Sequence, residues 1–279
     1  MVESGETLET LSSHGHDIKE ASEFIHYCQS DVLFEAIPVN YRDGQPALKC
    51  IRAALNSGMH VFSANKGPVV FGYNELTKLA ESKGVKYYFE SAVMDGVPVF
   101  AMFRELLPEI EVKAIRGILN STTNLIISLM ERNASFEDAL RHAQSIGVAE
   151  TDPSGDIDGW DAAVKICALA TVLMNTAVRP QMVDRTGIRN LTRNNVSSAK
   201  KKGKRWKLIC EAVRTDNRVA CRVSPQEVGV DSPFYHVENT SSIIQFETDM
   251  LGRLSILEEN SNLTTTAYGL FADFISSMK

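Results

Sequence analysis

Three short apolar runs separated by helical segments restrict the fold of this chain more than any other feature of its sequence. Residues 31–37, 60–64 and 85–93 are the runs, and each is typical of a buried strand. Residues 46–57 and 73–84 lie between them and predict helices, the second ending at Gly84. Because strands joined by crossover helices run parallel, this order predicts an α/β fold with a parallel sheet.

A second pattern begins after about residue 98. Helical segments are expected at residues 99–107, 122–132, 135–147 and 159–175, and strand-like runs follow from residue 205 onward. The last segment, about residues 264–279, predicts an amphipathic helix. The strand-like runs indicate an α+β layer with a mixed or antiparallel sheet.

Charge and cysteine content exclude several classes of protein. The net charge of −6 argues against a general nucleic-acid binder, and we expect the basic run at residues 200–207 to be a solvated loop or helix face. The five cysteines include no CxxC pair, which indicates free thiols in a reducing compartment. No run is apolar enough to span a membrane, and the first residues do not resemble a secretory signal, so we expect a cytoplasmic protein.

An acidic stretch that leads directly into an apolar helix is the strongest functional signal. Five carboxylates lie between Glu150 and Asp161, and Lys165 follows on the apolar helix face that also carries Asp161. One interpretation is a surface ion pair of minor energetic value. The other is a buried lysine whose pKa is lowered by burial, so that it acts as a general acid or base. A calcium loop is excluded, because Lys165 would stand at its twelfth position in place of glutamate.

Several motifs resemble one enzyme family in the same order along the chain. They are GVAETDPSGDIDGWDAAVK (147–165), GILNSTTNLI (117–126), SANKGPV (63–69), FESAVMDGVPVF (89–100), TSSIIQFETDMLG (240–252) and TAYGLFADF (266–274). On these motifs the chain is identified as a member of the homoserine dehydrogenase family, from about residue 31 to its end. The resemblance implies interconversion of aspartate 4-semialdehyde and homoserine with NAD or NADP, in threonine and methionine biosynthesis.

The resemblance also assigns roles to individual positions. Lys165 matches the proton donor, and Lys66 matches a second active-site lysine beside cofactor and substrate. The positions that match substrate contacts are Thr122, Glu150, Asp156 and Asp161. The positions expected near the cofactor are Ile37, Lys66, Gly147 and Asn262. A sodium site would consist of the Glu90 carboxylate and the backbone carbonyls of Val93, Asp95 and Val97.

The family pattern divides the chain into three parts and shows where it departs from its relatives. Residues 1–98 would form a partial Rossmann-like NAD(P)-binding domain, residues 99–263 a catalytic and dimerisation domain, and residues 264–279 a helix returning to the first domain. No GxGxxG phosphate loop occurs, so we expect a truncated sheet with an exposed edge. Ile37 replaces a family threonine, and Asn262 replaces a glycine.

Two interpretations of these departures stay open. In the first, the chain is a homoserine dehydrogenase, or a fragment of one, that acts on a small molecule as a homodimer. In the second, it is a non-catalytic relative that binds a small amino acid or pairs with a full-length subunit. A plastid location would require a longer precursor.

Overall fold

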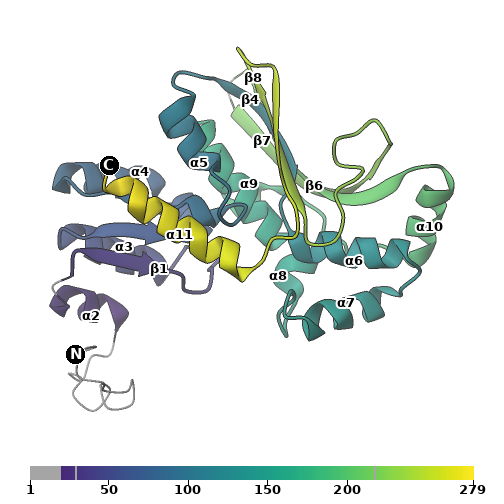
Figure 1. Cartoon of the computed structure of the whole chain (residues 1–279), viewed down its shortest axis with the longest axis horizontal. Helices are drawn as coiled ribbons and strands as arrows, with labels where there is room; N and C mark the ends of the chain where they lie inside the picture. The colour runs from purple at the N-terminus through teal and green to yellow at the C-terminus, as the bar shows by residue number, and fades with distance from the viewer. Residues whose placement is uncertain (1–19, 29, 217) are drawn as a thin grey trace.

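A three-stranded parallel sheet forms the first of two lobes in the computed structural model, which describes residues 20–28, 30–216 and 218–279. The strands are β1 (Val32–Glu35), β2 (His60–Ser63) and β3 (Tyr87–Tyr88), in the order β1-β2-β3. The helices α3 (Ala47–Asn56) and α4 (Lys66–Lys83) connect them, and α2 (Ala21–Tyr27) precedes them (Figure 1). The predicted parallel sheet is confirmed, whereas residues 1–19 of the predicted first domain lie outside the described residues.

Two predicted boundaries in this lobe are wrong. The helix expected at residues 73–84 begins at Lys66, because Asn65 caps it by accepting the Gly67 N–H and Pro68 is tolerated in a first turn. The strand expected at residues 85–93 pairs only at Tyr87 and Tyr88. The chain then turns into the short 3₁₀ helix η2 (Glu90–Ala92).

A six-stranded mixed sheet forms the second lobe, as the sequence predicts. Its order is β5-β7-β6-β4-β8-β9, and all pairs are antiparallel except β5 with β7. The strands are β4 (Val112–Ile118), β5 (Asp184–Arg185), β6 (Arg205–Thr215), β7 (Arg218–Val228), β8 (Ser242–Thr248) and β9 (Arg253–Glu258). The sequence analysis did not assign β4, although β4 lies between β6 and β8 inside the sheet.

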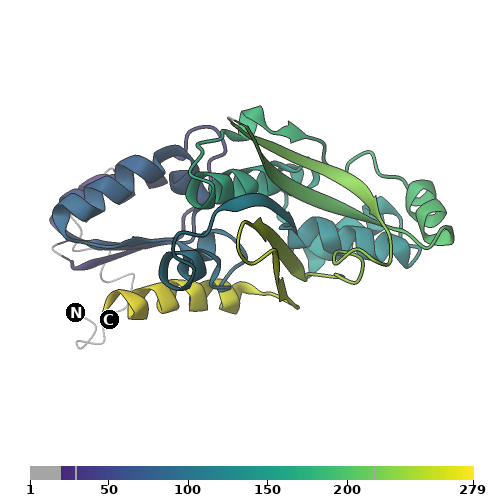
Figure 2. The same ribbon diagram turned by 90° about the horizontal axis from the view of Figure 1, so that it is seen from above.

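Helices of the second lobe cover the sheet and connect it to the first lobe (Figures 1 and 2). They are α6 (Ser121–Glu131), α7 (Phe136–Ser145), α8 (Ser154–Ile157), α9 (Trp160–Leu173) and α10 (Arg193–Lys201), preceded by α5 (Val99–Ala101) and the π-helix η3 (Met102–Leu106). The helix α9 is buried along most of its length and packs against α4, β6 and β7. The main apolar core therefore runs through both lobes, and a smaller separate cluster lies in the second lobe around Ile118, Ile209 and Phe234.

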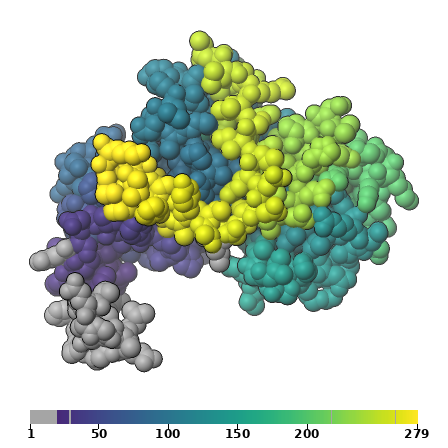
Figure 3. All heavy atoms as spheres, in the orientation of Figure 1, coloured from purple at the N-terminus to yellow at the C-terminus, as the bar shows by residue number. Residues whose placement is uncertain are grey.

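The last helix, α11 (Leu263–Ser277), returns from the second lobe to the first (Figure 3). It lies on the face of the three-stranded sheet opposite α4 (Figure 2). The Phe274 ring lies 5.9 Å from the Phe34 ring and 5.8 Å from the Phe62 ring, both measured between centroids. The Asp273 carboxylate accepts the Glu90 N–H at 2.7 Å. The sheet of the first lobe is thus packed on both faces.

Two further expectations concern cysteines and membranes. All five cysteines are free, which confirms the prediction from their number and spacing. Among the helices of the described residues, none combines the length and hydropathy that crossing a bilayer requires.

The basic run at residues 200–207 departs from its prediction over its last three residues, which begin strand β6 instead of continuing a solvated loop or helix face. Lys207 is fully buried and donates from Nζ to Asn124 Oδ1 at 3.2 Å and to the Val237 carbonyl. Its side chain lies on the inward face of β6, because successive side chains of a strand point to opposite faces of the sheet. The position of Lys207 in the strand thus decides its burial, although the segment around it is basic. Burial lowers the pKa of Lys207 to about 8, and the Glu131 charge only partly opposes this effect.

Replacing Lys207 with methionine should change how stability depends on pH. Because the pKa of Lys207 is about 8 when folded and 10.5 in its ordinary state, the unfolded chain binds more protons between these values. The free energy of unfolding of the wild-type protein should therefore rise by up to about 3 kcal/mol over this window. Urea unfolding at pH 8 and pH 10 measures the rise. Lys207→Met should lose it, whereas Lys201→Met at the exposed end of α10 should keep it.

Candidate functional site

A cavity between the lobes collects five of the residues that the sequence predicts for the site: Ile37, Lys66, Glu150, Asp156 and Asp161. It has a volume of about 230 Å³ and lies at the carboxyl ends of β1 and β2, the edge at which parallel sheets bind ligands. Its lining consists of Ile37, Val39, Tyr41, Ala64, Asn65, Lys66, Glu150, Asp152, Gly155, Asp156 and Asp161. Carboxylates from the second lobe thus face a lysine from the first.

The carboxylate of Asp161 joins two lysines. Its Oδ1 lies 3.0 Å from Lys66 Nζ, and its Oδ2 lies 3.0 Å from Lys165 Nζ. Asp161 occupies the first turn of α9, so Lys165 follows one turn later on the same face. The predicted Asp161–Lys165 pair is confirmed, but it is buried and shared with Lys66 rather than placed on the surface.

The charges in this cluster oppose the effect of burial. Burial alone would raise the pKa of Asp161, but the adjacent Lys165 and Lys66 ammonium groups hold it well below its usual range. Burial alone would lower the pKa of Lys165, but the Asp161 and Asp95 charges raise it above its ordinary value. The expectation of a lysine pKa lowered by burial is therefore wrong, and Lys165 is an ammonium ion at neutral pH.

The Lys165 ammonium has two partners among the described residues. An ammonium has three N–H groups. One is donated to the Leu119 carbonyl at 2.8 Å, and a second faces Asp161. Leu119 directly follows β4, so the central strand of the mixed sheet fixes the position of Lys165. The third N–H has no partner among the described residues, and Lys165 itself lies behind Asp161, outside the lining of the cavity.

Asn120 orders the acidic groups from the N-terminus of α6. Its Nδ2 donates to Asp156 at 2.7 Å and to Asp161 at 2.9 Å, while its Oδ1 caps the helix by accepting the Thr123 N–H. Burial and the nearby Asp161 charge raise the pKa of Asp156. Thr122 lies in the first turn of α6 and donates from Oγ1 to the Val148 carbonyl at 3.0 Å.

Glu35 fixes the edge of the site that belongs to the first lobe. This buried carboxylate ends β1 and accepts from Ser63 Oγ at 2.5 Å, from Asn65 Nδ2 at 3.2 Å and from the Ile37 N–H at 3.0 Å. The network joins the ends of β1 and β2 to the start of α4. Lys66, the first residue of that helix, therefore has a fixed backbone from which to reach Asp161.

Some predicted residues lie outside the lining of this cavity. Gly147 follows α7 with φ of 73°, a left-handed conformation that suits glycine, and is exposed. The Asn262 side chain caps α11 by accepting the Thr264 N–H at 2.9 Å. The cofactor contacts of Gly147 and Asn262 therefore stay predictions.

The predicted cation site is also separate from the cavity. The Glu90 carboxylate accepts the N–H groups of Phe100 at 2.6 Å and Ala101 at 2.7 Å, and burial raises its pKa to about 7. The Val97 carbonyl accepts the Val99 N–H at 2.8 Å. Within the described ranges, no group of three or more His, Cys, Asp or Glu side chains is arranged to hold a metal ion.

Two residues of the site were not predicted from the sequence. Asn120 was part of a quoted motif, and its Asn-x-x-Thr spacing could have indicated a helix cap next to the acidic cluster. Tyr41 stacks on Trp160 with ring centroids 6.5 Å apart and lines the cavity. Burial, followed by the charges of three nearby carboxylates, raises the pKa of its hydroxyl. No local sequence signal points to Tyr41.

A comparison with protein families shows which family the chain belongs to. Residues 98–275 match the family model described as homoserine dehydrogenase. The chain belongs to the homoserine dehydrogenase family. Members of this family are oxidoreductases that act on a CH–OH group of a small molecule with NAD or NADP.

Individual homoserine dehydrogenases support the assignment. The chain is 32% identical to the NAD(+)-dependent homoserine dehydrogenase of Pseudomonas canavaninivorans, over 89% of this chain and 71% of that protein. It is 36% identical to the homoserine dehydrogenase of Sulfurisphaera tokodaii, over 88% of this chain and 76% of that protein. The crystal structure of the Thiobacillus denitrificans enzyme superimposes with a TM-score of 0.84 at 29% identity, covering 97% of this chain and 63% of that one.

Proposed function

We propose that this chain interconverts L-aspartate 4-semialdehyde and L-homoserine with NAD(P)H, and that Asp161, Lys66 and Lys165 form the centre of the reaction. The observation that carries the proposal is the buried carboxylate shared by two lysines at 3.0 Å each. Reduction of an aldehyde creates an alkoxide that needs a proton. A lysine held as an ammonium ion, with one N–H that has no partner among the described residues, is suited to donate it.

The role of Lys66 follows from the same geometry. Within the described part of the chain, its ammonium has Asp161 as its ion-pair partner, which leaves further N–H groups facing the cavity. We propose that Lys66 orients the substrate oxygen or carboxylate, and that the Asp161 carboxylate holds both lysine ammonium groups in place. Because the cluster is mostly withdrawn from solvent, its charges act on a bound substrate with little screening.

The acidic residues that line the cavity are suited to the amino end of the substrate. Glu150 and Asp156 face the cavity from the loop before α8 and from α8 itself, and Asn120 fixes the position of Asp156. An ammonium group carries three N–H donors that match such carboxylates. Thr122 lies at the N-terminus of α6, where free backbone N–H groups favour the substrate carboxylate.

The residues at the ends of β1 and β2 fit the nicotinamide end of a dinucleotide. Ile37 is 38% exposed and offers an apolar surface at the cavity, next to the polar Asn65 and Lys66. The bound cofactor supplies the hydride.

Substitution of Glu150 should separate binding from turnover. Glu150 is exposed at the cavity and forms no ion pair with the described residues, so Glu150→Gln should leave the fold unchanged. We expect KM for homoserine to rise about tenfold, because one hydrogen bond to a charged group contributes roughly 1.5 kcal/mol, while kcat stays within about twofold. Steady-state assays of NADP reduction with homoserine measure both constants. An unchanged KM would remove Glu150 from substrate binding, and Glu137→Gln on α7 is the charge-matched control.

The proposed activity itself is tested with the wild-type chain. NADPH and NADH oxidation is followed in the presence of aspartate 4-semialdehyde, and calorimetry measures cofactor binding separately. Turnover supports the proposal. A folded chain that binds neither cofactor would instead favour a non-catalytic relative.

Two finer features complete the proposal. The family resemblance supports a homodimer, and exposed apolar residues Val213 and Leu257 on strands of the mixed sheet are compatible with a covered face. The resemblance also supports a sodium ion beside Glu90. Each oxygen of that carboxylate accepts one N–H and retains a second lone pair for a cation.

A further inference from the structure

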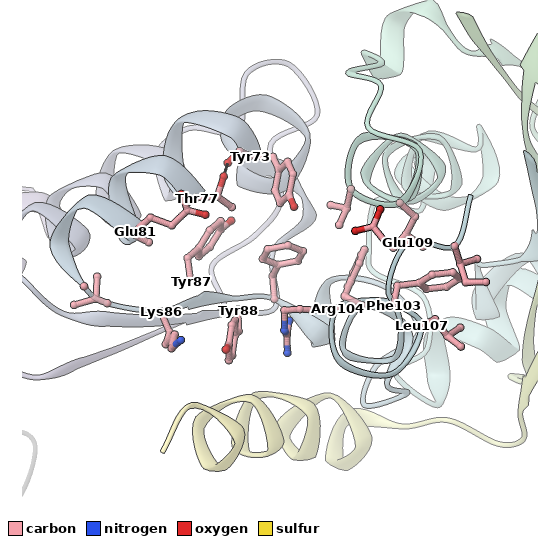
Figure 4. Close-up of a pocket in the computed structure, with 18 residues that line it drawn as sticks. Tyr73, Thr77, Glu81, Lys86, Tyr87, Tyr88, Phe103, Arg104, Leu107 and Glu109 are labelled. Atoms are coloured by element: carbon pink, nitrogen blue, oxygen red, sulfur yellow. Dashed lines mark hydrogen bonds between the residues drawn. The ribbon is translucent and has the colours of Figure 1, made fainter. Parts of the chain in front are cut away.

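A second cavity lies along the later turns of α4, whereas the carboxylate–lysine site lies at the start of that helix. Its volume is about 730 Å³, within the range of small-molecule sites. One wall consists of α4 and β3, and the other consists of η3, the chain leading to β4, and the end of α9 (Figure 4). Its aromatic lining residues are Tyr73, Tyr87, Tyr88, Phe89, Phe100 and Phe103. None of the functions proposed above uses this cavity.

The aromatic side chains are fixed by one another. The Phe89 ring contacts the rings of Tyr73, Tyr87 and Phe100, with centroid distances of 5.8, 5.1 and 5.0 Å. Two of these contacts are edge-to-face, the arrangement that ring quadrupoles favour. The cavity therefore has rigid aromatic walls, and such walls attract cations through the negative faces of the rings.

The hydroxyl of Tyr87 is a polar group without a partner. Tyr87 is 5% exposed, and its hydroxyl oxygen makes no hydrogen bond to any described residue. Leaving a buried hydroxyl unpaired costs about 1–3 kcal/mol. Figure 4 shows the Tyr73 hydroxyl facing the space between the two walls, whereas the Tyr87 hydroxyl is directed toward α4. The Tyr87 oxygen has almost no accessible surface, so it lies behind the aromatic wall and is not a group that a bound ligand contacts.

Glu109 comes from the opposite wall and is an exposed carboxylate. Its carboxylate faces the same space in Figure 4, and it forms no ion pair with the residues that the structure describes. Its backbone has φ of 61°, a left-handed conformation that is uncommon for a residue with a side chain and that recurs at ligand sites. Glu109 also follows a π-helix, an irregularity frequent at functional sites.

The basic group at the rim is already engaged. The Arg104 guanidinium lies over the Tyr88 ring, 3.9 Å from its centroid, and Arg104 Nε lies 2.8 Å from the Glu105 carboxylate. Its charge is thus neutralised within its own wall. The other charged residues of the lining are the carboxylates of Glu81 and Glu109 and the ammonium of Lys86, so acidic groups outnumber basic ones among them.

We propose that this cavity binds a small organic cation that carries an ammonium group on an apolar body. The body would lie among the rings, and the ammonium would donate to the Glu109 carboxylate. Because the two walls belong to different lobes, such a ligand would contact both lobes at once. The proposal does not depend on the reaction proposed for the first site.

Calorimetry with three probes that share a phenylethyl body tests the proposal. Phenethylammonium is the cation, 2-phenylethanol the neutral isostere and 3-phenylpropionate the anion. We expect the cation to bind with a Kd below about 1 mM, at least tenfold more tightly than the alcohol, and the anion not to bind. Equal affinity for cation and alcohol, or no binding of the cation, would overturn the assignment.

Four variants locate the bound cation. Glu109→Gln should weaken phenethylammonium binding at least tenfold, whereas Tyr87→Phe, which removes an enclosed hydroxyl, should change it less than twofold. Glu111→Gln removes the same charge two residues away, outside the lining, and should bind like the wild type. Glu150→Gln should also bind like the wild type. Loss of binding in Glu150→Gln with retention in Glu109→Gln would place the cation in the first cavity and refute the proposal.

Discussion

Replacing Lys165 with alanine should lower kcat by about 10²–10⁴-fold, the usual contribution of a positioned proton donor. The nearby charges raise the pKa of Lys165, so the wild-type side chain carries its proton throughout the neutral range. The variant loses this donor while Asp161 keeps its pair with Lys66. Steady-state reduction of aspartate 4-semialdehyde at pH 7 measures the loss, and circular dichroism verifies the fold.

Added amines provide the internal control for Lys165. Alanine leaves space in the site, so ethylammonium should restore part of the turnover of Lys165→Ala and leave the wild type unchanged. A variant whose kcat stays within threefold of the wild type would show that another group delivers the proton. A low kcat without amine rescue would indicate that Lys165 mainly positions the site.

Asp161→Asn should cause the largest loss of stability of any single change at the site. The substitution keeps the shape of the side chain but leaves the ammonium groups of Lys66 and Lys165 in a mostly buried place without their carboxylate. Removing one partner of a buried ion pair costs about 3–5 kcal/mol. Urea denaturation at pH 7 measures the change in the free energy of unfolding.

The matched control for Asp161 is Asp158→Asn. Asp158 pairs with Arg189 at 2.7 Å in a more exposed position, and such pairs contribute about 0–1 kcal/mol. If both variants lost the same small amount, Asp161 would not be the electrostatic centre of the site. The pKa of Asp161 lies well below its usual range, so the difference between the variants should persist down to about pH 5 and shrink only in stronger acid.

The sequence predicted regular elements well and irregular ones poorly. The parallel strands and the mixed sheet were predicted because their apolar runs are continuous or alternate with period two. The strand β4 was missed because the register shifts between Val112 and Ala114, so that Val112 and Ile115, three residues apart, are both buried. The start of α4 was missed because Gly67 and Pro68 suggest a turn, although both fit its first turn.

In the site, contacts between residues close in sequence could be predicted, and contacts between distant residues could not. Asp161 and Lys165 were paired from spacing alone, since one helical turn separates them. The contact of Lys66 with Asp161 joins residues 95 positions apart, and only the packing of α4 on α9 brings them together. The sign of the Lys165 pKa shift was wrong for the same reason: burial can be inferred from a helix face, but the charges around a side chain cannot.

The return of α11 also affects how the protein is made. During synthesis, β1 and β2 leave the ribosome more than two hundred residues before Phe274, whose ring covers Phe34 and Phe62. One face of the first sheet stays open for that whole interval, and such unfinished intermediates are prone to aggregation. The early part of the chain would therefore depend on chaperones until α11 emerges. Nonsense mutations that remove α11 should yield insoluble rather than merely inactive protein.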